Sequence, residues 1–305
     1  AEAVEAASRS EVIIAVVGGS SARDFKTSYQ ETGAAIADEK SISDMECGEG
    51  FDRATLTLLG KQQDLLIALK ATGKPLIVVY IEGRPLDKVW SSKYADALLT
   101  ASYPGQEGGY AIADVLFGDY NPAGRLPVSV PRSVGQIPVY YNKKAPRNHD
   151  YVEQAASPLY TFGYGLSYTE FALDHFKIEK TEIPTDGKIE VSCTVSNIGA
   201  VAGDEVVQLY QAFHGAHVVR PNKQLAGFKR VHLNAGETKK ITFNLDTAQL
   251  GYYDEEMQFV VEPGQLDIMV GTSSEDLPFK ETISLTGEKI CVAGKRSYTC
   301  EVEEK

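Results

Sequence analysis

Residues 74–83 read KPLIVVYIEG, and an unbroken run of apolar and aromatic residues fills the middle of this stretch. Such a run predicts a strand that is buried on both faces, which is typical of a parallel sheet covered by helices. The preceding residues 61–73, KQQDLLIALKATG, place their leucines on one helical stripe and end in a glycine, which is suited to terminate a helix. We therefore expect a helix that leads into a buried strand.

The same alternation continues on both sides of this stretch. Upstream, an Ala-rich helical pattern runs into EVIIAVVGG at residues 11–19, which predicts another buried strand. Downstream, ADALLTASY at 95–103 predicts a third strand, and EGGYAIADVLFG at 107–118 predicts the helix after it. Alternating strands and helices indicate a parallel or mostly parallel sheet with helices on both faces. In such sheets, sites form in the loops beyond the carboxyl ends of the strands.

From about Phe171 the period of the apolar residues changes to two. KIEVSCTVSNIG at 188–199 alternates, and similar short segments follow it with turn residues between them. These segments are DEVVQLYQAF (204–213), KKITFNLD (239–246), MQFVVEPGQLDIMVG (257–271) and FKETISL (279–285). The spacing predicts an antiparallel β-sandwich, and no cluster of catalytic residues stands out in it.

The predicted fold class is therefore α/β followed by all-β. We expect an α/β domain at residues 1–130 and a β-sandwich at residues 171–287. Between them, residues 131–170 are rich in Pro, Gly and Tyr, which indicates an ordered connector packed by aromatic residues. Residues 288–305 form a C-terminal tail of unassigned role.

Composition and charge exclude several classes of function. The formal net charge of −12 disfavours binding to nucleic acid or anionic membranes, since both need a basic face. No apolar run reaches the roughly 18 residues that suggest a membrane span. The five histidines and four cysteines lack the spacing of metal ligands, so we expect no metal site. Cys291 and Cys300 bracket a short segment, and they either form a disulfide or remain free thiols.

About forty residues without a regular pattern separate the first strand from the helix near Lys61. Loops this long are uncommon in compact domains and are usually functional or disordered. Within this loop, GGSSARDF at 18–25 follows a strand as a phosphate-binding loop does, but it lacks the P-loop lysine. Further on, MECGEGFDR at 45–53 places Glu49 between two glycines, with Glu46 as a rival carboxylate. In isolation, such a pattern is more often a solvated turn than a catalytic site.

Four stretches resemble the C-terminal part of family-3 glycoside hydrolases, and they occur in the order of that family. They are GEGFDR (48–53), ALKATGKPLIVVYIEGRPL (68–86), YPGQEGGYAIADVLFGDYNPAGRLPVSVPRSVGQIPVYYN (103–142) and LYTFGYGLSYTEF (159–171). The resemblance covers the chain from near residue 11 to about residue 285. It implies a partial α/β sandwich domain that lacks its beginning, followed by a fibronectin type III-like domain. It also implies that the N-terminal (β/α)8 barrel of the family is missing.

The resemblance assigns roles to individual residues. It implies that Glu49 is the general acid/base of a retaining β-glycosidase and that Phe51 is an aromatic residue beside the substrate. In the family the nucleophile is an aspartate of the barrel in an S-D-W motif. ISDM at 42–45 lacks the tryptophan and lies too close to GEGFDR, so Asp44 is not assigned as the nucleophile. No metal or organic cofactor is expected, because two carboxylates carry out the reaction.

Three other charged residues in these motifs have structural interpretations. Asp52 and Arg53 are expected to pair with each other or to brace the loop. Glu107 stands at the start of a predicted helix, where a carboxylate favours the helix dipole.

Two functions remain open at this point. The first is the acid/base-bearing part of an enzyme that releases terminal non-reducing β-linked sugars, with β-glucosidase favoured over β-xylosidase. Its expected partners are a β-linked oligosaccharide or glycoside and the missing barrel, its expected location is periplasmic or extracellular, and the isolated chain is expected to be inactive. The second is a non-catalytic carbohydrate-binding or scaffolding module of the same fold.

Overall fold

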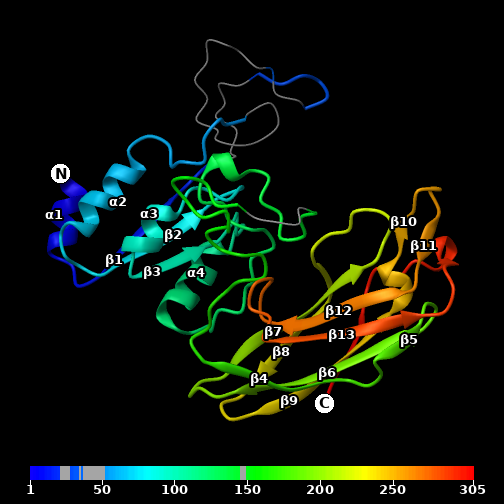
Figure 1. Cartoon of the computed structure of the whole chain (residues 1–305). Coiled ribbons are helices and arrows are strands. Elements are labelled where there is room, and N and C mark those ends of the chain that lie inside the picture. Colours follow the sequence, from blue (N-terminus) through cyan, green and yellow to red (C-terminus); the bar gives the residue numbers. More distant parts are fainter. Residues whose placement is uncertain (21–27, 34–35, 37–51, 145–148) are drawn as a thin grey trace. The chain divides into compact units, whose positions relative to one another are not determined.

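The computed structural model of the chain describes residues 1–20, 28–33, 36, 52–144 and 149–305 (Figure 1). The chain divides into two compact units. The first comprises Ala1–Phe117 and Val130–Pro138, and the second comprises Gly118–Ser129 and Val139–Lys305. The first unit combines a sheet with helices, whereas the second is built mainly from strands.

The first unit contains a parallel sheet with the strand order β1–β2–β3. Its elements are α1 (Glu2–Ser8), β1 (Ile13–Gly18), α2 (Gln62–Lys70), β2 (Leu76–Ile81), α3 (Val89–Tyr94), β3 (Ala97–Thr100), α4 (Gly108–Phe117) and the 3₁₀ turn η1 (Val134–Gln136). The predicted alternation of strands and helices is confirmed, and the strands run parallel as expected.

One face of this sheet packs against α1, α2 and α3. The buried side chains of its core are Ala7, Ile13, Ala15, Val17, Leu58, Leu66, Leu69, Leu76, Val78, Tyr80 and Leu86, with Trp90 of α3 packed against them. β2 is buried on both faces, since Val78 and Val79 are both fully inaccessible. β1 is buried on one face only, because Ile14 and Val16 are 40% and 62% exposed. The prediction that this strand is buried is therefore wrong for the face that carries Ile14 and Val16, because the helices α1, α2 and α3 cover the other face.

The second unit is a sandwich of two main sheets, with strand orders β5–β13–β12–β7–β8 and β15–β9–β6–β4. Its strands are β4 (Phe171–Ile178), β5 (Glu182–Pro184), β6 (Lys188–Asn197), β7 (Gly203–His214), β8 (Gln224–Leu233), β9 (Thr238–Asp246), β12 (Gly264–Gly271), β13 (Phe279–Thr286) and β15 (Glu301–Glu304). A smaller sheet contains β10 (Tyr252–Tyr253), β11 (Phe259–Val261) and β14 (Ile290–Cys291). Two 3₁₀ turns, η2 (Thr247–Leu250) and η3 (Ala293–Lys295), complete the unit. The predicted β-sandwich is confirmed.

Alternation along the strands builds the core of the sandwich. In β6, the side chains of Ile189, Val191, Cys193 and Val195 are at most 1% exposed, and they meet buried residues from the facing sheet. Burial raises the pKa of the Cys193 thiol to about 12, so this cysteine behaves as a small apolar core residue.

The segment Gly118–Ser129 belongs to the second unit because its polar side chains bond to the sandwich. Asn121 donates to the Ala202 carbonyl over 2.9 Å and accepts from the Ser167 hydroxyl over 2.9 Å. Arg125 and Glu205 form an ion pair of 2.6 Å in which both side chains are 8% exposed. A buried pair of this kind holds the segment firmly, since removing one partner would leave an uncompensated charge.

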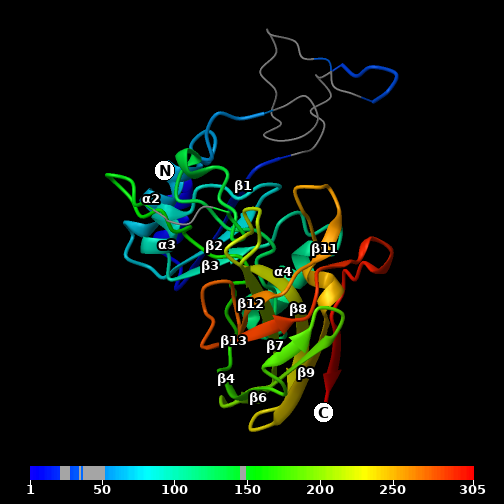
Figure 2. The same ribbon diagram turned by 45° about the vertical axis from the view of Figure 1, so that its right-hand side comes forward.

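The C-terminal tail also takes part in the sandwich. β14 pairs with β11, and β15 pairs with β9 in an antiparallel direction. The C-terminus lies beside β9 in two views of the chain (Figure 1 and Figure 2). Cys291 and Cys300 are free thiols, so the second of the two alternatives left open by the sequence holds in this structure.

Asp267 of β12 is a buried carboxylate that three side chains satisfy. Its oxygens lie 2.7 Å from Lys280 Nζ, 2.6 Å from Thr282 Oγ1 and 2.9 Å from His214 Nε2. Burial acts to raise its pKa, but the hydrogen bonds outweigh burial and lower the pKa to about 2. Asp267 therefore stabilises the folded sandwich as a carboxylate.

We expect Asp267→Asn to destabilise the second unit by ~2 kcal/mol near neutral pH. A depressed folded-state pKa contributes stability above the unfolded-state value of 3.8, and this contribution disappears as the pH falls toward about 2. Urea unfolding at about pH 7 and about pH 2 should therefore show a gap between the wild type and the variant that closes in acid. Asp186→Asn, at an exposed position, is the control and should show little gap at either pH. A gap of equal size at both pH values would contradict this account.

Candidate functional site

A buried ion pair lies at the carboxyl end of β2, where sites form in open parallel sheets. Glu82 and Lys88 are 5% and 1% exposed, and both carboxylate oxygens of Glu82 lie 2.6 Å from Lys88 Nζ. Glu82 also accepts from the backbone N–H of Leu86 over 2.9 Å. Lys88 Nζ donates to the Leu86 carbonyl over 3.2 Å and lies 4.5 Å from the centre of the Tyr80 ring. These contacts close residues 82–88 into a fixed turn.

The electrostatics of the pair explain why neither partner is dispensable. Burial lowers the pKa of Lys88, and the carboxylate of Glu82 opposes this effect. The two charges are therefore stable inside the protein only together. Removing one partner of a buried pair typically costs about 3–5 kcal/mol, because the other charge stays buried without compensation.

The long loop between β1 and α2 begins and ends at this edge, and one side chain joins its two stems. The Gln62 amide accepts from the Gly18 N–H over 2.8 Å and donates to the Gly18 carbonyl over 3.0 Å and to the Leu59 carbonyl over 3.2 Å. Gly18 has φ +148°, and a Cβ atom there would lie 1.8 Å from the carbonyl oxygen of Ile81. The departure of the loop from β1 thus requires glycine.

The second stem, residues 52–58, is fastened to the turn 82–88. Arg84 Nη1 lies 3.0 Å from Asp52 Oδ1, and the Asp87 N–H donates to the Leu56 carbonyl over 2.7 Å. The pKa of Asp52 is lowered, first by the hydrogen bond from the Arg53 N–H and then by the Arg84 guanidinium. Arg53 donates through its side chain to the Thr57 carbonyl. Of the two roles expected for Asp52 and Arg53, bracing is the one observed, because the Asp52 side chain pairs with Arg84.

A pocket opens where the stem, the turn and the end of β3 meet. It is lined by Gly19, Arg53, Glu82, Gly83, Arg84, Leu86 and Tyr103. Glu82 is paired with Lys88, and Asp52 is paired with Arg84. The described residues of this edge therefore form a framework that fastens both ends of the segment between β1 and α2.

The sequence-predicted site residues fall partly outside this framework. Glu49 and Phe51 lie outside the described residues, and so do Glu46 and Asp44. Glu107 is exposed, and its carbonyl accepts the Ala111 N–H in the first turn of α4. 

Sequence reasoning missed Gln62, Glu82, Arg84 and Lys88. A signal for three of them was present in EGRPLDK at 82–88, where four charged residues directly follow a buried parallel strand.

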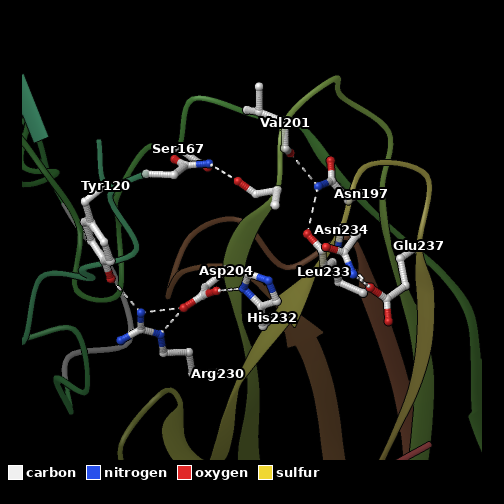
Figure 3. Close-up of polar contacts among 12 residues, drawn as sticks. Tyr120, Ser167, Asn197, Val201, Asp204, Arg230, His232, Leu233, Asn234 and Glu237 are labelled. Atoms are coloured by element: carbon white, nitrogen blue, oxygen red, sulfur yellow. Dashed lines mark hydrogen bonds and ion pairs between the residues drawn. The ribbon is translucent and has the colours of Figure 1, made fainter. Parts of the chain in front are cut away.

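A second polar cluster lies in the sandwich (Figure 3). Asp204 lies 2.6 Å from His232 Nδ1 and 2.6 Å from Arg230 Nε, and Arg230 donates to the Tyr120 hydroxyl over 2.6 Å. Burial opposes ionisation of Asp204, but the hydrogen bonds from His232 and Arg230 outweigh it and lower its pKa. The cluster joins Tyr120, shortly after α4, to β7 and β8, which is a structural role.

The described ranges of the chain contain no group of three or more His, Cys, Asp or Glu side chains that could hold a metal ion. None of their helices is both long and apolar enough to span a membrane.

Comparison with known protein families gives two matches. Residues 1–168 match the glycosyl hydrolase family 3 C-terminal domain, and residues 205–274 match a fibronectin type III-like domain. A periplasmic β-glucosidase of Salmonella typhimurium is 41% identical over 284 residues, which is 90% of this chain and 34% of the relative. A β-xylosidase of Formosa agariphila is also 41% identical, over 93% of this chain and 37% of its own length.

Solved structures show the same relationship. The β-glucosidase of Listeria innocua in complex with glucose matches with a TM-score of 0.81 and 32% identity, over 93% of this chain and 38% of that protein. The chain thus spans roughly a third of the length of the proteins it matches.

We expect Lys88→Met to destabilise the first unit by about 3–5 kcal/mol, because the Glu82 carboxylate would remain buried without its cation. The matched control is Lys70→Met, which removes an ion pair of 2.7 Å with Asp96 in which the side chains are 32% and 52% exposed. That change should cost at most about 1 kcal/mol. Denaturant unfolding of the two variants gives both changes in the free energy of unfolding. Changes of similar size would contradict the idea that burial makes the Glu82–Lys88 pair more important for stability than an exposed pair.

Proposed function

Because the chain belongs to glycosyl hydrolase family 3, we propose that it forms the acid/base-bearing part of a retaining β-glycosidase. In this proposal Glu49 is the general acid/base and Phe51 contacts the sugar. The nucleophile is supplied by a (β/α)8 barrel joined to this chain in the complete enzyme. The observation that carries the proposal is that GEGFDR runs, in the sequence, into residues 52–58, which are fastened at the carboxyl edge of the parallel sheet.

The chemistry explains why such a loop would be held at its base. Retention needs two carboxylates about 5–5.5 Å apart, one that attacks the sugar and one that protonates the leaving group and later activates water. A carboxylate presented to another domain must project from its own domain, and its stems must be fixed for its position to be defined. The ties made by Gln62 and Arg84 supply this fixation. The reaction requires no metal or organic cofactor, since the two carboxylates carry it out.

The substrates are terminal non-reducing β-linked sugars, with β-glucosides first and β-xylosides second. Both activities occur in the names of relatives that are 41% identical to this chain. One of those relatives is named as periplasmic, which supports a periplasmic or extracellular location. The net charge of −12 suits a neutral ligand better than a polyanion.

Glu49→Ala in the complete enzyme should impair substrates in proportion to how much their leaving group needs a proton. The loss for cellobiose should be about 10²–10⁴-fold in kcat/KM, whereas a dinitrophenyl β-glucoside should keep most of its value, because its phenolate leaves unaided. Azide, an anionic nucleophile that needs no base, should restore turnover of the activated substrate and yield a β-glycosyl azide. Glu46→Ala is the control. Uniform losses without azide rescue would mean that Glu49 is not the proton donor.

We also expect the 305-residue chain by itself to have no glycosidase activity, because it supplies one of the two carboxylates. The assay follows release of nitrophenol from nitrophenyl β-glucoside and β-xyloside by the purified chain. Turnover above background that Glu49→Gln abolishes would place the nucleophile within this chain and refute the proposed division of roles.

A further inference from the structure

The turn 82–88 carries Arg84, and a buried ion pair between the two ends of the turn holds it in place. Glu82, at the start of the turn, is held by Lys88 at its end, and both side chains are buried. This pair fixes the turn relative to β2 without any contribution from the contact between Arg84 and Asp52. The Arg84 side chain is 29% exposed and reaches outward to Asp52 over 3.0 Å.

Asp52 stands only three residues after Glu49 in the sequence, so a contact that holds Asp52 acts close to the proposed acid/base along the chain. Beyond Asp52, the stem is held a second time, since the Asp87 N–H donates to the Leu56 carbonyl over 2.7 Å. Leu56 and Leu58 are also buried, at 9% and 7% exposed. Among the described residues, Asp52 is the tie between the stem and the turn that stands nearest to Glu49 in the sequence.

The exposure of Asp52 separates a positioning role from a stabilising one. Its side chain is 91% exposed, and an ion pair in such a place contributes little to the free energy of unfolding. A small displacement of a catalytic group, by contrast, costs a large factor in rate. Loss of this contact is therefore expected to have little effect on stability, so an effect on the rate would report a change in the position of the stem.

We propose that Arg84 is a positioning residue for the acid/base: by holding Asp52, it fixes the stem from which Glu49 reaches the leaving group. This inference rests on the proposed function, in which Glu49 is the proton donor. Arg84 itself does not contact the substrate in this proposal. It acts through Asp52.

The test uses the complete enzyme that contains this chain, with cellobiose and a dinitrophenyl β-glucoside as substrates. Arg84→Gln and Asp52→Asn should each lower kcat/KM for cellobiose about 10-fold and that for the dinitrophenyl glucoside less than about 2-fold, because a misplaced acid harms the substrate that needs protonation. The double variant should lose no more than either single variant, since the two side chains act as one contact. Arg84→Lys should recover most of the loss, because lysine keeps the positive charge that pairs with Asp52 and glutamine does not.

Asp64→Asn is the matched control, since Asp64 makes an ion pair of 3.0 Å with Lys61 and its side chain is 67% exposed. It should leave both substrates unaffected. If Glu49→Ala shows the leaving-group dependence of an acid/base but Arg84→Gln does not, the positioning role is refuted and the proposed function stands. If the losses of Arg84→Gln and Asp52→Asn are additive, or equal for both substrates, the positioning role is also refuted. If Glu49→Ala itself lacks leaving-group dependence, the assignment of Glu49 falls and this inference falls with it.

Discussion

At the end of β2, a lysine ammonium and a glutamate carboxylate are removed from water together. Neither charge is stable there alone, and their mutual contact, with the backbone bonds around it, holds residues 82–88 in one conformation. The rest of the sheet edge follows from this turn. The stem at residues 52–58 binds to it, Gly19 donates to Ile81 beside it, and the pocket is formed around it. A polar pair inside an otherwise apolar core thus defines the edge that supports the long loop.

The strongest sequence signals were those with a clear period. The apolar run of β2 and the alternation of β6 predicted strands that the structure contains, with burial on both faces for β2 and on one face for β6. The apolar run of β1 misled, because Ile14 and Val16 are apolar although they lie on an exposed face of the strand. The composition of a strand reports which residues are apolar, and it does not report whether another segment covers each face.

The candidate site could be predicted only in part. GEGFDR identified the loop by resemblance, but Gln62 and Arg84 act through contacts with residues 44 and 32 positions away. Such contacts depend on the tertiary fold, and no local pattern encodes them. Lys88 is buried because it pairs with Glu82, and its own neighbours in the sequence do not indicate this burial.

The last strand of the sandwich has a consequence for solubility. β15 occupies the side of β9 that would otherwise present a row of unpaired backbone N–H and C=O groups. Exposed edges of this kind recruit strands from other molecules and lead to aggregation. The strand that takes this place contains three glutamates, and two of them, Glu303 and Glu304, form ion pairs with lysines. The lysine contacts of Glu304 join β15 to β8 and β9, so the tail covers this edge with a strand that is held both by backbone pairing and by ion pairs.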